Sequence, residues 1–143
     1  MPFDTVDKLL FDSSVCGIIE FRIYSKNLYG ITDMNQEAEK ITGYDINEIL
    51  SLPHKIDISK MIYDEDVNIV VNEIASLVLT GKSEKIEYRI ISRSGDIHWI
   101  SGKFILVENT DFVESAPSCI INSFVCIDDR KEAEENLRHS AIA

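Results

Sequence analysis

Apolar and polar residues alternate along five stretches of the chain, and this alternation predicts β-strands. In the first stretch Ile19 and Phe21 share one face, while Glu20 and Arg22 lie on the other. A strand that is buried on one side has this pattern. We therefore expect strands over residues 17–23, 28–34, 86–90, 98–106 and 119–127.

Other stretches have apolar residues every three or four positions, which predicts helices. The clearest runs from Val67 to Thr80 and ends at Gly81, a residue that readily takes the left-handed conformation of a helix terminus. Shorter helices are expected over residues 35–42, ended by Gly43, and over residues 46–50.

Both ends of the chain are also predicted to be helical. Apolar residues between Phe3 and Leu10 have helical spacing and form one face. Near the other end, Asp129 and Glu132 have the spacing of a capping box, in which two side chains satisfy the free N–H groups of a helix start. We expect a flanking helix over residues 1–12, the main domain over 13–127 and the start of a linker helix over 128–143.

This order of elements predicts an α+β fold. Two strands, several short helices, one longer helix and three strands assemble most simply into a five-stranded antiparallel sheet with the helices on one face. The chain has 143 residues, which is the size of one domain with a single core.

Charge and cysteine content narrow the function. The formal net charge is -11, so the surface repels the phosphates of nucleic acids and anionic membranes, and no apolar run is long enough to span a bilayer. Three cysteines without metal-ligand spacing indicate free thiols in a reducing compartment. We expect a cytoplasmic domain without nucleic-acid binding or direct membrane contact, although a larger parent protein could be membrane-anchored.

Several short motifs, in this order and spacing, resemble the PAS family, in its subgroup with the C-terminal PAC motif. The resemblance covers roughly residues 8 to 138, and its second half is the more specific. The motifs are Gly17 to Phe21, Asn35 to Tyr44, Glu87-Tyr88-Arg89, Arg93-Ser94-Gly95, Trp99 and Val125 to Glu134.

The resemblance implies a sensory input module of bacterial or archaeal signalling proteins. Such a module binds a small ligand or a partner and relays the change through its C-terminal helix to an output domain in the parent protein, for example a histidine kinase or a diguanylate cyclase. An alternative is a PAS dimerisation or interaction module without a ligand. A further alternative, a small isomerase-like enzyme, would need an acid or base on the inner strand faces; we expect no catalytic residue and no enzyme activity in this chain.

Ligands of the family sit between the inner face of the sheet and the helices. Alternation places residues of the strands expected over 86–90 and 98–106 on this inner face, and the resemblance adds two residues of the last strand. A plain hydrophobic core explains the apolar members equally well, whereas a buried amide needs a hydrogen-bond partner. The candidates for the ligand pocket are Tyr88, Ile90, Ile100, Phe104, Asn122 and Phe124.

The junction with the C-terminal helix departs from the family pattern. Cys126-Ile127-Asp128 stands where the family has Asp-Ile-Thr. Asp128 can cap a helix as Thr does, but Cys126 cannot supply the missing carboxylate. We expect Asp128 or Asp129 to take over its contact with a basic residue, so these three residues are the candidates for signal relay.

The sequence leaves the cofactor unknown, but neither flavin nor haem is expected. A flavin adduct would need a cysteine in the helix after Gly43, and haem would need an axial histidine in the long helix; neither is present. Acids at 64–66 are explained by the dipole of the following helix rather than by a metal or acid pair. A structural role is expected for His98, rather than that of a ligand or a proton switch.

The other face of the sheet is expected to carry an apolar patch. Ile97, Trp99, Ile105 and Val107 would point away from the helices, and an exposed apolar patch usually marks a contact. Either the flanking helix folds over this patch or a second subunit does, and we predict a homodimer that uses both.

Overall fold

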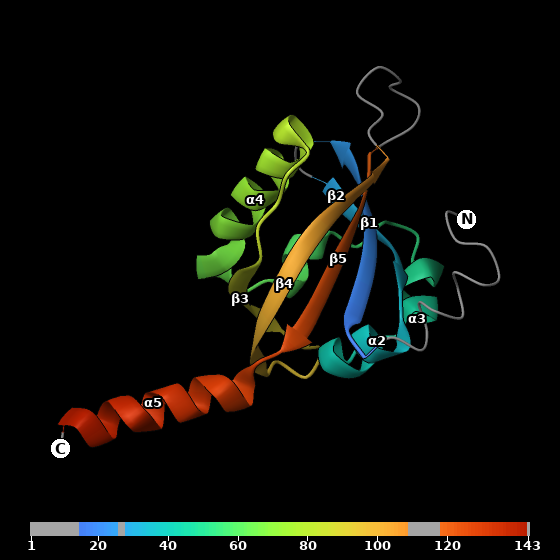
Figure 1. Cartoon of the computed structure of the whole chain (residues 1–143). Coiled ribbons are helices and arrows are strands. Elements are labelled where there is room, and N and C mark those ends of the chain that lie inside the picture. Colours follow the sequence, from blue (N-terminus) through green and yellow to red (C-terminus); the bar gives the residue numbers. More distant parts are fainter. Residues whose placement is uncertain (1–14, 26–27, 109–117, 143) are drawn as a thin grey trace.

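The computed structural model describes residues 15–25, 28–108 and 118–142. These residues contain the predicted five-stranded antiparallel sheet, and the strand order is β2-β1-β5-β4-β3 (Figure 1). The first and last strands are therefore neighbours near the middle, with Gly17 opposite Phe124. The strands are β1 Gly17–Ser25, β2 Leu28–Met34, β3 Ile86–Ile91, β4 Ile97–Glu108 and β5 Ser118–Cys126.

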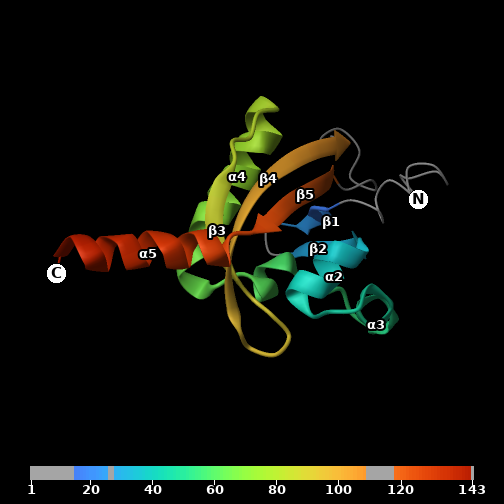
Figure 2. The same cartoon turned by 60° about the horizontal axis from the view of Figure 1, so that its bottom comes forward.

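The segment between β2 and β3 contains the helices that cover one face of the sheet. Helix α4 lies beside β3 and β4, while α2 and α3 lie towards β1 and β2 (Figures 1 and 2). The helices in this segment are α2 Gln36–Thr42, α3 Ile46–Ser51, the 3-10 turns η1 Ile58–Met61 and η2 Asp64–Asp66, and α4 Val67–Thr80.

The buried Asn35 side chain joins β1 to the start of α2. Its Oδ1 accepts hydrogen bonds from Ile18 N at 2.8 Å and from Ala38 N at 2.9 Å, and its Nδ2 donates to the Cys16 carbonyl at 2.9 Å. Asn35 is therefore both the N-cap of α2 and a cross-link to the neighbouring strand. The helix ends at Gly43 in the left-handed conformation, as predicted.

The hydrophobic core lies between the helices and the inner face of the sheet. Val70, Ile74 and Leu77 of α4 recur at helical spacing and are buried. They belong to the same cluster as Phe21 of β1 and Phe104 of β4. The long helix and its buried face agree with the prediction from periodicity.

Two local features differ from the expectations. The turn η1 was not predicted; Asp57 caps it, and its Ile58 and Met61 are buried. The last helix, α5 (Asp128–Ile142), begins at residue 128 as expected, but Asp129 lies within its first turn and is not its cap, and Lys131 N donates to Ile127 O there. The predicted flanking helix at 1–12 lies outside the described residues.

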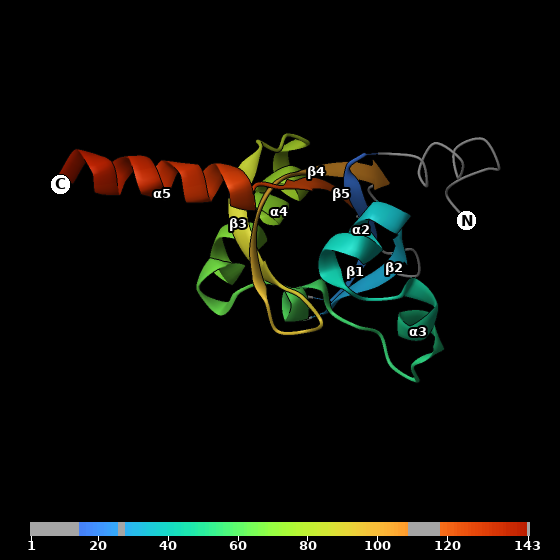
Figure 3. The same cartoon turned by 90° about the horizontal axis from the view of Figure 1, so that it is seen from below.

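Helix α5 leaves the sheet directly after β5 and projects away from the rest of the domain. Figure 3 shows it pointing away from α2 and α3, on the opposite side of the molecule. In the described part of the chain, no helix has the length and apolar character needed to cross a membrane.

Candidate functional site

The six residues predicted to line a ligand pocket all lie on the inner face of the sheet and are buried. Exposure of each is 5% or less. They come from the three neighbouring strands β3, β4 and β5; alternation predicted the members on β3 and β4, and the resemblance added those on β5. The residues are Tyr88, Ile90, Ile100, Phe104, Asn122 and Phe124.

Tyr88 and Asn122 form a polar pair inside this apolar face. Asn122 Nδ2 donates to Tyr88 Oη at 2.7 Å, whereas Asn122 Oδ1 is buried without a hydrogen-bond partner. Gly102 leaves space for both, because a Cβ there would lie 3.1 Å from each oxygen. Burial raises the pKa of Tyr88, so its phenol stays protonated at neutral pH.

Aromatic rings fill much of the space around this pair. The ring of Phe104 is stacked with Tyr88, with a centroid separation of 6.3 Å, and meets Phe21 edge to face at 6.2 Å. A Cβ on Gly17 would lie 2.7 Å from the ring of Phe124. The inner face is thus a packed core in which the unpartnered Asn122 oxygen is the polar feature that a ligand or water could satisfy.

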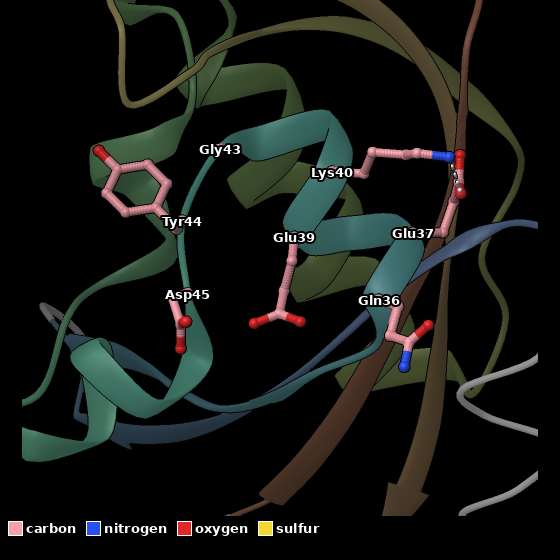
Figure 4. Close-up of a pocket in the computed structure, with 7 residues that line it drawn as sticks. All are labelled: Gln36, Glu37, Glu39, Lys40, Gly43, Tyr44 and Asp45. Carbon is pink, nitrogen blue, oxygen red and sulfur yellow. Dashed lines mark ion pairs between the residues drawn. The ribbon is translucent and has the colours of Figure 1, made fainter.

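An open surface hollow lies elsewhere, on the outer side of α2 and the turn that follows it (Figure 4). Its side chains serve local structure: Glu39 accepts a hydrogen bond from Ile46 N at 2.9 Å, and Lys40 lies 3.8 Å from Glu37. None of the six pocket candidates lines this hollow.

A second group of side chains joins the start of α4 to the sheet. Arg89 on β3 donates to the Asp66 carboxylate through Nε at 2.9 Å and Nη2 at 2.8 Å, and its backbone N donates at 2.7 Å. These hydrogen bonds lower the pKa of Asp66 and raise that of Arg89. The paired geometry fixes η2 against β3, which the dipole explanation for residues 64–66 did not predict.

Trp99 connects this group to α5. The guanidinium of Arg89 lies over the Tyr63 ring at 4.2 Å and over the Trp99 ring at 5.0 Å. Lys131, in the first turns of α5, lies 4.4 Å from the Trp99 centroid. Such cation–π contacts hold β3, β4 and α5 together.

Glu87 makes the complementary ion pairs from β3 to α5. Its carboxylate lies 2.8 Å from Lys131 Nζ and also binds the guanidinium of Arg130. The hydrogen bonds from Lys131 and Arg130 lower the pKa of Glu87 to about 2. The motif residues Glu87, Arg89, Trp99, Arg130 and Lys131 therefore form one connected cluster, which we call the junction cluster.

Asp128 ties the first turn of α5 to β4. Its Oδ1 accepts a hydrogen bond from Trp99 N at 2.7 Å, and its Oδ2 lies 2.7 Å from His98 Nδ1. Burial opposes the charge, but the hydrogen bonds from His98, Trp99 and Cys126 outweigh it and lower the pKa of Asp128. Of the two predicted substitutes for the family's carboxylate, Asp128 makes these contacts.

Cys126 is exposed at the end of β5 and contacts the same carboxylate. Desolvation of its sulfur raises the pKa of Cys126; the Asp128 backbone N–H lowers it less, and the nearby carboxylates raise it further. The thiol is therefore mainly protonated at neutral pH. Cys119, on the same strand, is fully buried.

The predicted apolar patch lies on the face of the sheet that the helices of the described residues do not cover. Ile97, Ile105 and Val107 are 51%, 48% and 43% exposed, and Trp99 is half-buried beside α5. Val125 of β5, 39% exposed, lies on the same face, where it pairs with Ser101 of β4. The prediction missed Val125, whose alternation with the buried Phe124 was the available signal.

Comparison with known proteins identifies the family. The family model of the PAS fold matches residues 31–115. The chain belongs to the PAS fold family. The match includes Glu87, Arg89 and Trp99 but ends before β5, so Cys126 and Asp128 lie outside it. No curated protein sequence gives a significant match.

Solved PAS structures share the fold at low sequence identity. A sensory box histidine kinase/response regulator from Burkholderia thailandensis E264 is 23% identical, with TM-score 0.65, over 94% of this chain and 93% of that chain. A PAS domain from Colwellia psychrerythraea is 16% identical, with TM-score 0.69 and coverages of 88% and 99%. A light-oxygen-voltage (LOV) protein from Rhodobacter sphaeroides is 16% identical, with TM-score 0.63 and coverages of 83% and 64%.

Proposed function

We propose that this chain is a sensory input module that relays a change in the domain through α5 to an output domain in a parent protein. The observation that carries the proposal is the contrast along α5. Its first turns are held by Trp99 and Glu87, whereas the rest projects from the domain, and Leu137 is 71% exposed. A histidine kinase or a diguanylate cyclase is the output that we propose.

The junction cluster supplies a continuous path for such a relay. Asp66 at the start of α4 binds Arg89, Arg89 contacts Trp99, and Trp99 contacts Lys131 of α5. A shift of α4 relative to the sheet would change these contacts and the direction in which α5 leaves. A signal can bias the output when it binds the two arrangements with different affinity.

The input is a small ligand in the core or a partner on the sheet. The unpartnered Asn122 Oδ1 supports a ligand, because a buried amide oxygen without a hydrogen bond is costly. The close packing of Phe104, Tyr88 and Phe21 supports the alternative of a PAS interaction module without a ligand. Native mass spectrometry of the purified chain decides between them: a stoichiometric small molecule supports the first, and the bare protein mass supports the second.

We also propose that the chain has no enzyme activity and uses neither flavin nor haem. Tyr88 and Asn122 are the polar pocket candidates, and the raised pKa of Tyr88 keeps its phenol protonated, so that it cannot accept a proton at neutral pH. The helices α2, α3 and α4 contain no cysteine for a flavin adduct, and α4 contains no histidine for haem. Absorption spectra of the purified chain should therefore lack flavin and haem bands.

The apolar patch, the acidic surface and the cysteine content lead to three more proposals. Ile105 and Val107 on β4 and Val125 on β5 are exposed on the same face of the sheet, which supports a homodimer formed through this face. The net charge of -11 supports a protein without nucleic-acid or direct membrane contact, and three cysteines without metal-ligand spacing support a cytoplasmic location.

A chimera tests the relay. The chain is fused through α5, in continuous helical phase, to the dimerising helix of a histidine kinase of known activity. Replacing Glu87 by Gln or Trp99 by Ala should change the autophosphorylation rate, because both release the start of α5. Glu84→Gln, an exposed acid three residues earlier, is the matched control. Equal rates in all four chimeras would contradict relay through the junction cluster.

A further inference from the structure

We propose that His98, Cys126 and Asp128 form a binding site for one Zn²⁺ ion at the start of α5. The three residues come from β4, β5 and α5, and they offer a nitrogen, a sulfur and an oxygen donor. Their donor atoms all lie within 4.8 Å of one another. Zinc in proteins prefers this mixture of donors, and three protein ligands leave a fourth position for water.

The spacing of the donors fits a small ion. Zinc bonds of about 2.0 Å to nitrogen or oxygen and about 2.3 Å to sulfur place tetrahedral donors about 3.3 to 3.6 Å apart. In the structure His98 Nδ1 and Asp128 Oδ2 are separated by 2.7 Å, and no two of the three donor atoms are more than 4.8 Å apart. An ion would replace the hydrogen bond between these two side chains, and small side-chain rotations would bring the three donors to it.

The backbone around the three residues is held in place before any ion binds. Cys126 pairs with Ile100 across the strands, and Ile127 N donates to Trp99 O at 2.9 Å. Trp99 N donates to Asp128 Oδ1, which orients the carboxylate and leaves Oδ2 to bind. Hydrogen bonds from outside the ligand set commonly orient metal ligands in this way.

Charge and access also favour a cation. Cys126 is exposed, and Asp128 borders an open hollow along α5 in which the acids Glu132, Glu134 and Glu135 accompany the bases Lys131 and Arg138, so that acidic side chains are in excess. The nearest basic residues of the helix, Arg130 and Lys131, are paired with Glu87. The carboxylate and a thiolate formed on binding would together balance the charge of the ion, with the thiol proton released to solvent.

The three ligands were not recognised in the sequence because 28 residues separate His98 from Cys126. Local spacing of cysteine and histidine gives no signal for a site that strand pairing assembles. The inference does not depend on the proposed function, but an ion at this place would bridge the sheet and the first turn of α5.

Metal titration of the complete 143-residue chain tests the site. After treatment with a chelator and a phosphine reductant, the chain is titrated with Zn²⁺ by calorimetry and with Co²⁺ by absorption spectroscopy. We expect one ion per chain and a thiolate-to-cobalt charge-transfer band in the near ultraviolet. Cys126→Ser should abolish the band, and Cys126→Ser and His98→Gln should each weaken Zn²⁺ binding by roughly tenfold or more.

Matched variants separate the site from other donors of the chain. Cys119→Ser, seven residues from Cys126 at the other end of β5, and His54→Gln, between α3 and η1, remove a thiol and an imidazole away from the junction and should leave Zn²⁺ binding unchanged. Circular dichroism of each metal-free variant verifies that it is folded. The proposal is wrong if the wild-type chain binds no stoichiometric Zn²⁺, if folded Cys126→Ser binds it equally well, or if the cobalt complex lacks the charge-transfer band. A negative result would not affect relay through Glu87 and Trp99, which the kinase chimera measures separately.

Discussion

At the residue scale, two buried polar side chains of this PAS domain, Asn122 and Asp66, form specific hydrogen bonds. Asn122 donates to Tyr88 inside an otherwise apolar face, and Asp66 accepts three hydrogen bonds from Arg89. Removing one partner of a buried pair leaves the other without its hydrogen bond, which costs more than the pair contributed. Single substitutions at these positions should therefore have measurable effects on stability.

Tyr88→Phe should destabilise the domain by about 1 to 2 kcal/mol, because the Asn122 amide loses its acceptor while it stays buried. Urea unfolding followed by circular dichroism measures this change. Tyr24→Phe removes a hydroxyl from a tyrosine that is 36% exposed and should change the stability by about 0.5 kcal/mol or less. Equal effects of the two substitutions would argue against a specific role of the hydrogen bond.

Asp66→Asn should destabilise the domain by about 2 kcal/mol at neutral pH, since Arg89 loses a charged partner. Hydrogen bonds from Arg89 hold the folded-state pKa of Asp66 below its ordinary value of 3.8. The stabilisation is complete above 3.8 and is lost as the pH falls through the folded-state pKa. The difference between wild type and variant should therefore narrow in acid.

Unfolding free energies measured across acidic and neutral pH test this expectation. Asp64→Asn, at an exposed position in the same turn, is the control and should not change the pH dependence. A wild-type advantage that stays constant down to the lowest pH would contradict the assignment to ionised Asp66.

At the scale of elements, the motif residues of β3, β4 and α5 have a shared structural role. Glu87, Arg89 and Trp99 are spread over two strands, yet all contact either the first turns of α5 or the residues that support them. Antiparallel pairing places Arg89 opposite Trp99. The motif residues therefore form one surface of the sheet, and the first turns of α5 pack against it.

Glu87→Gln should loosen the first turns of α5, because Arg130 and Lys131 lose their ionised partner. The pairs are exposed, so the global stability should change little. Amide hydrogen exchange measured by mass spectrometry should become faster in residues 128–134, while Glu84→Gln should leave it unchanged. Unchanged exchange in Glu87→Gln would mean that hydrogen bonds from Trp99 and Ile127 alone hold the helix.

Periodicity predicted most of the elements but not the contacts between them. Alternation located the strands, and Gly43 and Gly81 marked the ends of two helices because they take the left-handed conformation there. Strand order depends on pairing between distant residues, such as Gly17 and Phe124, which local patterns do not encode.

The candidate site could be predicted only in part, because local patterns do not encode contacts between distant residues. Alternation placed Tyr88 and Phe104 on the inner face, since side-chain direction in a strand follows directly from position. The contact of Asp128 with His98 joins residues 30 positions apart, and that of Asp66 with Arg89 joins residues 23 apart. Asp66 was explained by the dipole of the following helix, so its role as the hydrogen-bond partner of Arg89 was not predicted.

At the scale of the whole molecule, the two faces of the sheet differ. The helices cover one face, whereas the other exposes Ile97, Ile105, Val107 and Val125 among the described residues. Water contact with these side chains is unfavourable, and a second copy of the chain could remove it. A substitution on this uncovered face therefore tests whether two copies of the chain associate through it.

Ile105→Lys should shift the proposed dimer towards monomer, because it would place a charge inside the contact, while folding stability changes by about 0.5 kcal/mol or less. Size-exclusion chromatography with light scattering over a range of protein concentrations gives the mass. Leu79→Lys, at an 84% exposed position on α4, is the control. A monomeric wild-type chain at high concentration would rule out the dimer.

The pairing of β1 with β5 also determines how the domain can be joined to other parts of a polypeptide. Gly17 at the start of β1 faces Phe124 near the end of β5, so the backbone enters and leaves the sheet at the same end. A unit with adjacent entry and exit points can be inserted between two existing segments without forcing them apart. Force applied at these points would peel the two central strands from each other one residue pair at a time.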